Sequence, residues 1–96
     1  MKEVSADLPG HELVSAGIAD LAAGRESEPA LLVAMAAPRL RALGYDVPPG
    51  SELPRRPSHR LYALLADSGQ DAHSRYNALV GRMVSFARAA EHASPR

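Results

Sequence analysis

The sequence predicts an all-α fold, a compact four- to five-helix bundle with a long Pro-rich loop and a C-terminal αα-hairpin. Several segments repeat apolar residues every three or four positions, which is the period of an amphipathic helix. Proline and glycine gather between these segments, where helices begin and end. No run of residues alternates apolar and polar side chains in the way that predicts a half-buried strand.

The chain has 96 residues, which is the length of one domain. A chain of this size buries roughly 60–68% of its unfolded surface, enough for one modest core without cross-links. Residues 1–6 show no periodicity. We therefore expect a disordered N-terminus, followed by a single helical domain over residues 7–92.

The composition excludes several classes of protein. There is no cysteine, so disulfides and thiolate chemistry are ruled out. The longest uncharged apolar stretch, residues 29–38, is far too short to span a bilayer, and the N-terminus lacks the apolar segment of a signal peptide. We therefore expect a cytoplasmic protein. Ten arginines to one lysine, together with abundant alanine, indicate a GC-rich bacterial genome.

The first helix is predicted at about residues 8–23. Asp7 is its expected N-cap, Pro9 is tolerated in its first turn, and Gly24 ends it. Its apolar face repeats at helical spacing and consists of Leu13, Val14, Gly17, Ile18 and Leu21.

A proline separates the next two helices. The second is predicted at about residues 28–37, with Ser27 as its N-cap. It has no polar face, so the other helices should surround it. Pro38 cannot donate the next helical hydrogen bond, which predicts a separate short helix over residues 38–43, ended by Gly44.

Residues 45–57 show no helical pattern and contain four prolines, Pro48, Pro49, Pro54 and Pro57. Loops of this length without structure of their own are uncommon in compact domains. The sequence from Pro54 to Pro57 is a minimal PxxP motif, which occurs often by chance. We expect the prolines to stiffen a crossover between two helical layers, with Leu53 and either Tyr45 or Val47 packed on the core. Whether the loop is also functional stays open.

The last two helices are predicted at about residues 59–68, capped by Ser58, and 72–91, capped by Asp71. A turn of about two residues, Gly69 and Gln70, joins them. A connection this short predicts an αα-hairpin, in which the two helices pack antiparallel.

The last helix carries two contrasting faces. Its apolar face consists of Ala72, Tyr76, Leu79, Val80, Met83, Phe86, Ala87 and Ala90. The opposite side is a line of small side chains, the small-residue stripe: Ser74, Ala78, Gly81, Ser85 and Ala89. A glycine within a helix costs roughly 1 kcal/mol relative to alanine, so Gly81 favours close approach of another helix. That helix is either the first helix of the same chain or a second copy across a two-fold axis. A third explanation is that the stripe arises by chance, because alanine is abundant throughout this chain.

Eleven basic and eleven acidic residues cancel, but they are unevenly distributed. Residues 1–34 hold two basic and six acidic side chains, whereas residues 35–96 hold nine arginines and five acidic side chains. We expect an acidic N-terminal helix to lie against a basic remainder.

An alternative interpretation uses five of these arginines as a phosphate-binding cluster: Arg39, Arg41, Arg55, Arg56 and Arg60. The chain would then be a nucleic-acid-binding regulator. The zero net charge and the lack of a recognition helix rich in Arg, Asn and Gln weigh against it.

No catalytic or metal site is predicted. The four histidines, His11, His59, His73 and His92, have no i, i+4 spacing and no carboxylate cluster beside them. There is no Gly-x-Ser-x-Gly elbow, no Gly-x-Gly-x-x-Gly and no Walker A motif. We expect no cofactor.

A helical nuclease-type enzyme is a further alternative. Small all-α ribonucleases of the HEPN type carry an arginine, four to six residues, and then a histidine. The nearest pairs here, Arg55 with His59 and Arg88 with His92, each enclose three residues, so the motif spacing is not met.

The sequence therefore favours a small non-catalytic protein-interaction module, which binds another protein or a second copy of itself through the last helix. The small-residue stripe is the predicted partner-binding surface.

Overall fold

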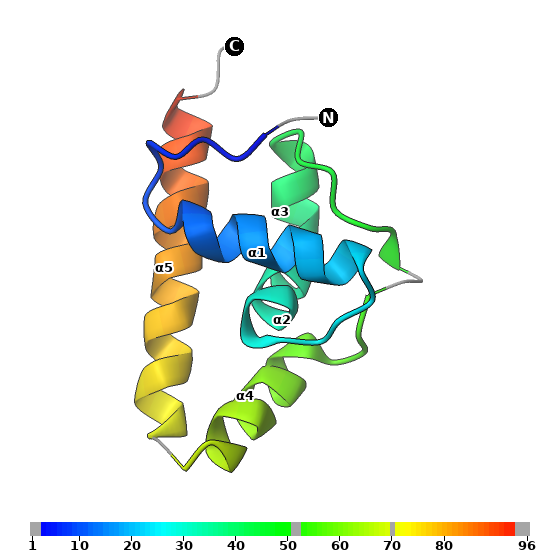
Figure 1. Ribbon diagram of the computed structural model, residues 1–96. Coiled ribbons are helices and arrows are strands. Elements are labelled where there is room, and N and C mark those ends of the chain that lie inside the picture. The colour runs from blue at the N-terminus through cyan, green and yellow to red at the C-terminus, as the bar shows by residue number, and fades with distance from the viewer. Residues whose placement is uncertain (1–2, 51–52, 70, 94–96) are drawn as a thin grey trace.

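Five α-helices and no strand make up the part of the chain that this computed structural model describes, residues 3–50, 53–69 and 71–93 (Figure 1). The all-α class is confirmed, with the larger of the two expected helix counts. The radius of gyration of 12.9 Å agrees with the roughly 13 Å expected for a compact domain of about 100 residues. The helices are α1 (His11–Ala22), α2 (Glu28–Met35), α3 (Ala37–Ala42), α4 (Pro57–Asp67) and α5 (Ala72–Ala93).

Helix α2 lies at the centre of the core. Four consecutive residues, Ala30 to Val33, have no exposed surface at all. Helices α1, α3, α4 and α5 all contact α2, so the prediction that the apolar helix is surrounded is confirmed. The covering helices supply further buried side chains, among them Val14, Leu40, Leu61, Leu65 and Phe86.

The predicted capping residues at two helix starts are confirmed. The Ser27 hydroxyl accepts a hydrogen bond from the Ala30 amide at 3.1 Å, and the Asp71 carboxylate accepts one from the Ser74 amide at 3.2 Å. These bonds satisfy amides that have no partner within the helix. The glycines predicted to end helices also adopt the expected left-handed conformation, namely Gly24, Gly44 and Gly69.

The predicted start of the first helix is wrong by three residues. Helix α1 begins at His11 rather than near residue 8, and Gly10 takes the N-cap position with φ 75° instead of Asp7. An ideal Cβ at Gly10 would lie 3.2 Å from the Arg82 carbonyl oxygen of α5. Glycine suits this position for two reasons: it adopts the left-handed conformation readily, and it leaves room for the Arg82 carbonyl of α5.

The predicted cap of α4 is also wrong. Arg56, in the left-handed conformation with φ 49°, is the N-cap residue instead of Ser58. Pro57 then occupies the first helical position, where its fixed φ suits a helix and its missing amide removes no bond. The other helix ends lie within two residues of their predicted positions.

Helices α2 and α3 are separate, as the proline predicted. Helix α3 begins at Ala37, one residue before Pro38. The chain that follows is tied to the core by Tyr45 and Val47, which are buried, and by Leu53, which is half-buried. The Tyr45 ring lies 5.7 Å from the ring of Phe86.

The predicted disordered N-terminus falls partly outside the described residues, because residues 1–2 are not described. Within the described part, Val4 is half-buried against the core cluster.

Three ion pairs join acidic residues of the N-terminal third to arginines further along the chain, and one of them, from Glu12, starts in the helix that was expected to lie against a basic remainder. Glu26 binds Arg60 at 2.5 Å, and Glu28 binds Arg75 at 3.1 Å. Glu12 of α1 binds Arg82 of α5. Each pair joins the N-terminal third of the chain to a helix of its C-terminal half.

Helix α1 approaches α2 closely at Gly17. An ideal Cβ there would lie 2.4 Å from both the Pro29 carbonyl oxygen and the Val33 Cγ2 atom. Real Cβ atoms do not come so near, so the glycine sets the distance between the two helices.

We predict that Gly17→Ala lowers the free energy of unfolding by at least about 1–3 kcal/mol, because backbone and core must move apart. Gly81→Ala is the matched control: the described residues leave open space there, and the change should stabilise by up to about 1 kcal/mol. Urea unfolding followed by far-UV circular dichroism, at low protein concentration, measures both. Equal effects of the two substitutions would contradict the close packing at Gly17.

Asp20 joins the end of α1 to the start of α2. It accepts hydrogen bonds from the Ser27 hydroxyl at 2.6 Å and from Arg25 at 3.0 and 3.1 Å. Both interactions favour the ionised carboxylate, Ser27 more than Arg25, and so lower the pKa of Asp20 below its ordinary value.

The lowered pKa predicts acid sensitivity. The unfolded chain takes up a proton at Asp20 at a higher pH than the folded chain does, so stability should fall as the pH drops below about 4. Asp20→Asn should make this fall shallower. Asp67→Asn, at an exposed position of α4, is the control and should leave it unchanged. Urea unfolding between about pH 7 and pH 3 tests the difference. Parallel curves for parent and Asp20→Asn would refute this role.

Candidate functional site

The small-residue stripe lies on the outer face of α5, directly opposite the core. Ser74, Ala78, Gly81 and Ser85 are exposed, and Ala89 is half-buried. An ideal Cβ at Gly81 would meet no described atom within 4 Å. The explanation that the first helix of the same chain covers the stripe is therefore wrong.

The contact between α1 and α5 lies elsewhere on α5. It runs through Gly10, which sits over the Arg82 carbonyl and near the Phe86 Cβ atom. Phe86 belongs to the buried face, together with Leu79 and Met83. Helix α1 therefore packs beside the core face and leaves the stripe open.

Charged and polar side chains border the stripe on both edges. Arg82 on one edge is held by Glu12. Arg88 on the other edge is exposed and forms no ion pair with a described residue. On the same edge, about three turns nearer the start of α5, the Asn77 amide lies 3.3 Å from the His73 imidazole.

An apolar groove runs beside the stripe, between α5 and the junction of α2 with α3. Its volume is about 340 Å³. Val80 and Val84 form its α5 wall, Met35 and Pro38 form the opposite wall, and all but the exposed Pro38 are half-buried. The groove exists because the chain breaks between α2 and α3. Arg39 lies at its edge.

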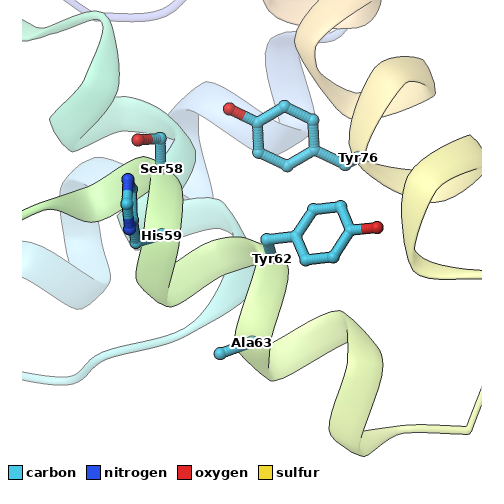
Figure 2. A pocket seen from close by; sticks show the side chains of 5 residues that line it. All are labelled: Ser58, His59, Tyr62, Ala63 and Tyr76. Carbon is cyan, nitrogen blue, oxygen red and sulfur yellow. The ribbon is translucent and has the colours of Figure 1, made fainter.

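A second, more open pocket of about 440 Å³ lies between α4 and α5 (Figure 2). Tyr62 of α4 and Tyr76 of α5 form its walls, with ring centroids 5.8 Å apart and planes inclined by 56°. Figure 2 shows the Tyr76 hydroxyl directed toward the side of Ser58, whereas the Tyr62 hydroxyl points away. The pocket offers aromatic faces and hydroxyl groups but contains no carboxylate and no guanidinium group among its lining residues.

The histidines do not converge. His59 lines the tyrosine pocket, and His73 contacts Asn77. His11 lies 3.1 Å from the Leu8 carbonyl oxygen and 3.4 Å from Glu12. Within the described residues, no three His, Asp or Glu side chains gather in a group that could hold a metal ion.

Three of the five predicted phosphate-binding arginines are bound to other groups of the chain. Arg39 makes a bidentate pair with Glu91, at 2.7 and 2.8 Å, and Arg60 makes one with Glu26. Arg41 donates instead to the carbonyl oxygens of Val47 and Pro48.

The hydrogen bonds from arginine keep the pKa of Glu91 and of Glu26 below the ordinary value, so both pairs are charged at neutral pH. The other two arginines of the predicted set, Arg55 and Arg56, directly precede the body of α4, and both are exposed. Arg55 and Arg60 line one pocket together with Arg25, a residue that the sequence interpretation did not select.

Comparisons of the chain with protein-family models, with curated proteins and with solved structures give no match. Among the described residues, none of the helices combines the length and the apolar character needed to cross a bilayer. Function therefore has to be inferred from the chain's own geometry.

Proposed function

We propose that this chain is a small non-catalytic protein-interaction module that self-associates through α5. The observation that carries the proposal is Gly81. It lies in the middle of a 22-residue helix, and no described atom would contact a side chain there. A helical glycine costs roughly 1 kcal/mol, and that cost is not offset within the described chain.

Two other glycines show what close packing looks like in this fold. Gly17 lets α1 approach α2, and Gly10 lets the start of α1 approach α5. Both positions are filled by neighbouring atoms within the chain. At Gly81 no described atom of the chain lies within 4 Å of an ideal Cβ. This difference favours a second molecule as the group that packs against Gly81.

The stripe has the symmetry that a pair of identical helices needs. Ser74 and Ala89 lie equally far from a point between Gly81 and Arg82, and so do Ala78 and Ser85. A two-fold axis through that point would place Ser74 opposite Ala89 and Ala78 opposite Ser85. Small side chains would then face small side chains at these four positions, and Gly81 would lie opposite Arg82 of the second copy.

The charges at the two ends of α5 suit an antiparallel pair. Asp71 caps the N-terminal end, and hydrogen bonds from Ser74 hold the pKa of its carboxyl below the ordinary value, so it is charged at neutral pH. Arg88 and His92 lie near the other end. In an antiparallel pair each Asp71 would approach Arg88 and His92 of the second copy, and the helix dipoles would also oppose each other.

The apolar groove would enlarge this contact. A stable interface buries about 1,000 Å² or more in total, which a single stripe of small residues does not provide. The groove lies beyond the edge of the stripe that carries Arg88, and its walls, Val80 and Val84 on one side and residues of α2 and α3 on the other, offer partly exposed apolar surface.

The remaining parts of the chain serve as support in this proposal. We infer that residues 7–92 act as one module in which α4 and α5 form a hairpin; the short turn between them and their mutual contact favour this. The Pro-rich segment would act as a connector, held by Arg41 and by the buried Tyr45 and Val47. The proposed location is the cytoplasm, as the sequence predicts.

We predict that the parent chain has a solution mass of about twice its 10.2 kDa and that Gly81→Glu shifts it to the monomer. Overfilling the contact costs roughly 1–3 kcal/mol, so the dimer should weaken by about 5- to 140-fold. Sedimentation equilibrium gives the mass, and far-UV circular dichroism checks that the monomer stays folded. Ala66→Glu, which adds the same charge to the exposed face of α4, should leave the dimer intact. A parent that stays monomeric at high concentration contradicts self-association, and unfolding of Gly81→Glu contradicts an open stripe.

A further inference from the structure

The end of α1 and the start of α4 lie on the side of the molecule away from α5 (Figure 1). Residues that follow α1, precede α4 and lie in α4 line a pocket there. Its volume is about 380 Å³. Three arginines line it: Arg25 follows α1, Arg55 precedes α4, and Arg60 lies in α4. Glu26 is the one acidic side chain among its described lining residues. The lining therefore carries an excess of positive charge.

Two of the arginines are held in place by carboxylates. Arg60 uses Nε and one terminal nitrogen for Glu26, at 2.5 and 2.6 Å. Arg25 uses the same two nitrogens for Asp20. A guanidinium group has five N–H donors, so each of these side chains keeps its second terminal nitrogen for a further acceptor. The ion pairs thus fix the direction of donors that remain available.

Arg55 differs from both because it forms no ion pair with a described residue. Among the three arginines of this pocket, Arg55 is therefore the one whose charge is not balanced by a described carboxylate. Bidentate and charge-assisted hydrogen bonds from arginine suit phosphate oxygens in particular.

The other side of the pocket is apolar. Leu21 is buried and Leu53 is half-buried, and both line it. Pockets for small molecules have volumes of about 300–1,000 Å³ and combine apolar walls with a few polar groups. The pocket therefore has room for more than an oxyanion, and its wall suits an apolar or planar body.

We propose that this pocket binds a small phosphate monoester, with the phosphate at Arg25, Arg55 and Arg60 and the organic part against Leu21 and Leu53. A monoester carries about −1.5 to −2 charges at neutral pH and has three free oxygens. Asp20 and Glu26 oppose two of the three arginines, but Arg25 and Arg60 each keep one free terminal nitrogen, and Arg55 keeps its whole guanidinium group for these oxygens. A phosphodiester carries one charge and offers fewer free oxygens. The site shares no residue with the α5 stripe, so either proposal can fail without the other.

Glu26 has a defined part in this proposal. Its carboxylate carries the same sign of charge as the bound phosphate and lies in the same pocket, so it repels the phosphate, whereas the amide oxygen of a glutamine could still accept a hydrogen bond from Arg60 and hold it in place. Removing its charge should therefore strengthen binding, whereas removing Arg55 should weaken it. If the phosphate were attracted only by a basic surface, any substitution that changes the net charge equally would change the affinity equally.

The test is a ¹H–¹⁵N NMR titration of the full chain with inorganic phosphate, dimethyl phosphate and phenyl phosphate. We expect saturable shifts of the Leu21, Gly24 and Leu53 amides. Phenyl phosphate should bind several-fold more tightly than inorganic phosphate, because its ring reaches the apolar wall. Dimethyl phosphate, a monoanionic diester, should bind more weakly than inorganic phosphate. No saturable shift with any probe, or equal binding of the diester, would overturn the proposal.

Matched variants separate the pocket from general charge. Arg55→Ala should weaken phenyl phosphate binding by about tenfold, the loss expected for one charge-assisted hydrogen bond. Arg88→Ala removes the same charge on α5 and should change binding little. Glu26→Gln should tighten binding, and Glu12→Gln, which breaks an ion pair elsewhere, should not. Equal effects within either pair would refute the site. Unchanged spectra of the remaining residues show that each variant is folded.

Discussion

The enclosure of α2 is the constraint on which the rest of this structure depends. Its residues Ala30 to Val33 have no exposed surface, and the helix has no polar face to turn toward water. A helix of eight residues is only about 12 Å long, so a few neighbours can cover it completely. Helices α1 and α4 lie directly against it, and Gly17 brings α1 near enough to exclude water. The order of the helices in space follows from this one requirement.

The same constraint explains why α5 has a free face. At 22 residues it is about 33 Å long, far longer than the helix that it helps to cover. One side, with Leu79, Met83 and Phe86, is buried in the shared core. No further helix of the described chain remains to cover the other side, so the small-residue stripe meets solvent. In the proposed function, this uncovered face of a long peripheral helix is the surface for a second copy of the chain.

Interactions between residues that are close in the sequence could be predicted, whereas contacts between distant segments could not. Ser27 and Asp71 could be identified as caps because their side chains bond amides only three residues away. The left-handed Gly10 could not, because its reason is the Arg82 carbonyl, about seventy residues further on. The apolar face of α5 was predictable from its period, but the exposure of its opposite face depends on where α1 docks. The meeting of Arg25 with Arg55 and Arg60 likewise requires the whole fold.

Zero net charge conceals an ordered arrangement of ions. The acidic side chains of the N-terminal third hold arginines of α4 and α5, as Glu12, Glu26 and Glu28 show. Exposed pairs of this kind contribute little to stability, but they remove arginines from the set available to ligands. Arg55 and Arg88 lie outside these pairs in the described chain. One lies in the pocket between α1 and α4, and the other borders the stripe on α5. Arg56 is likewise exposed and outside these pairs, just before α4. Each of the two surfaces proposed to bind another molecule thus has one arginine that folding leaves without a described ion pair.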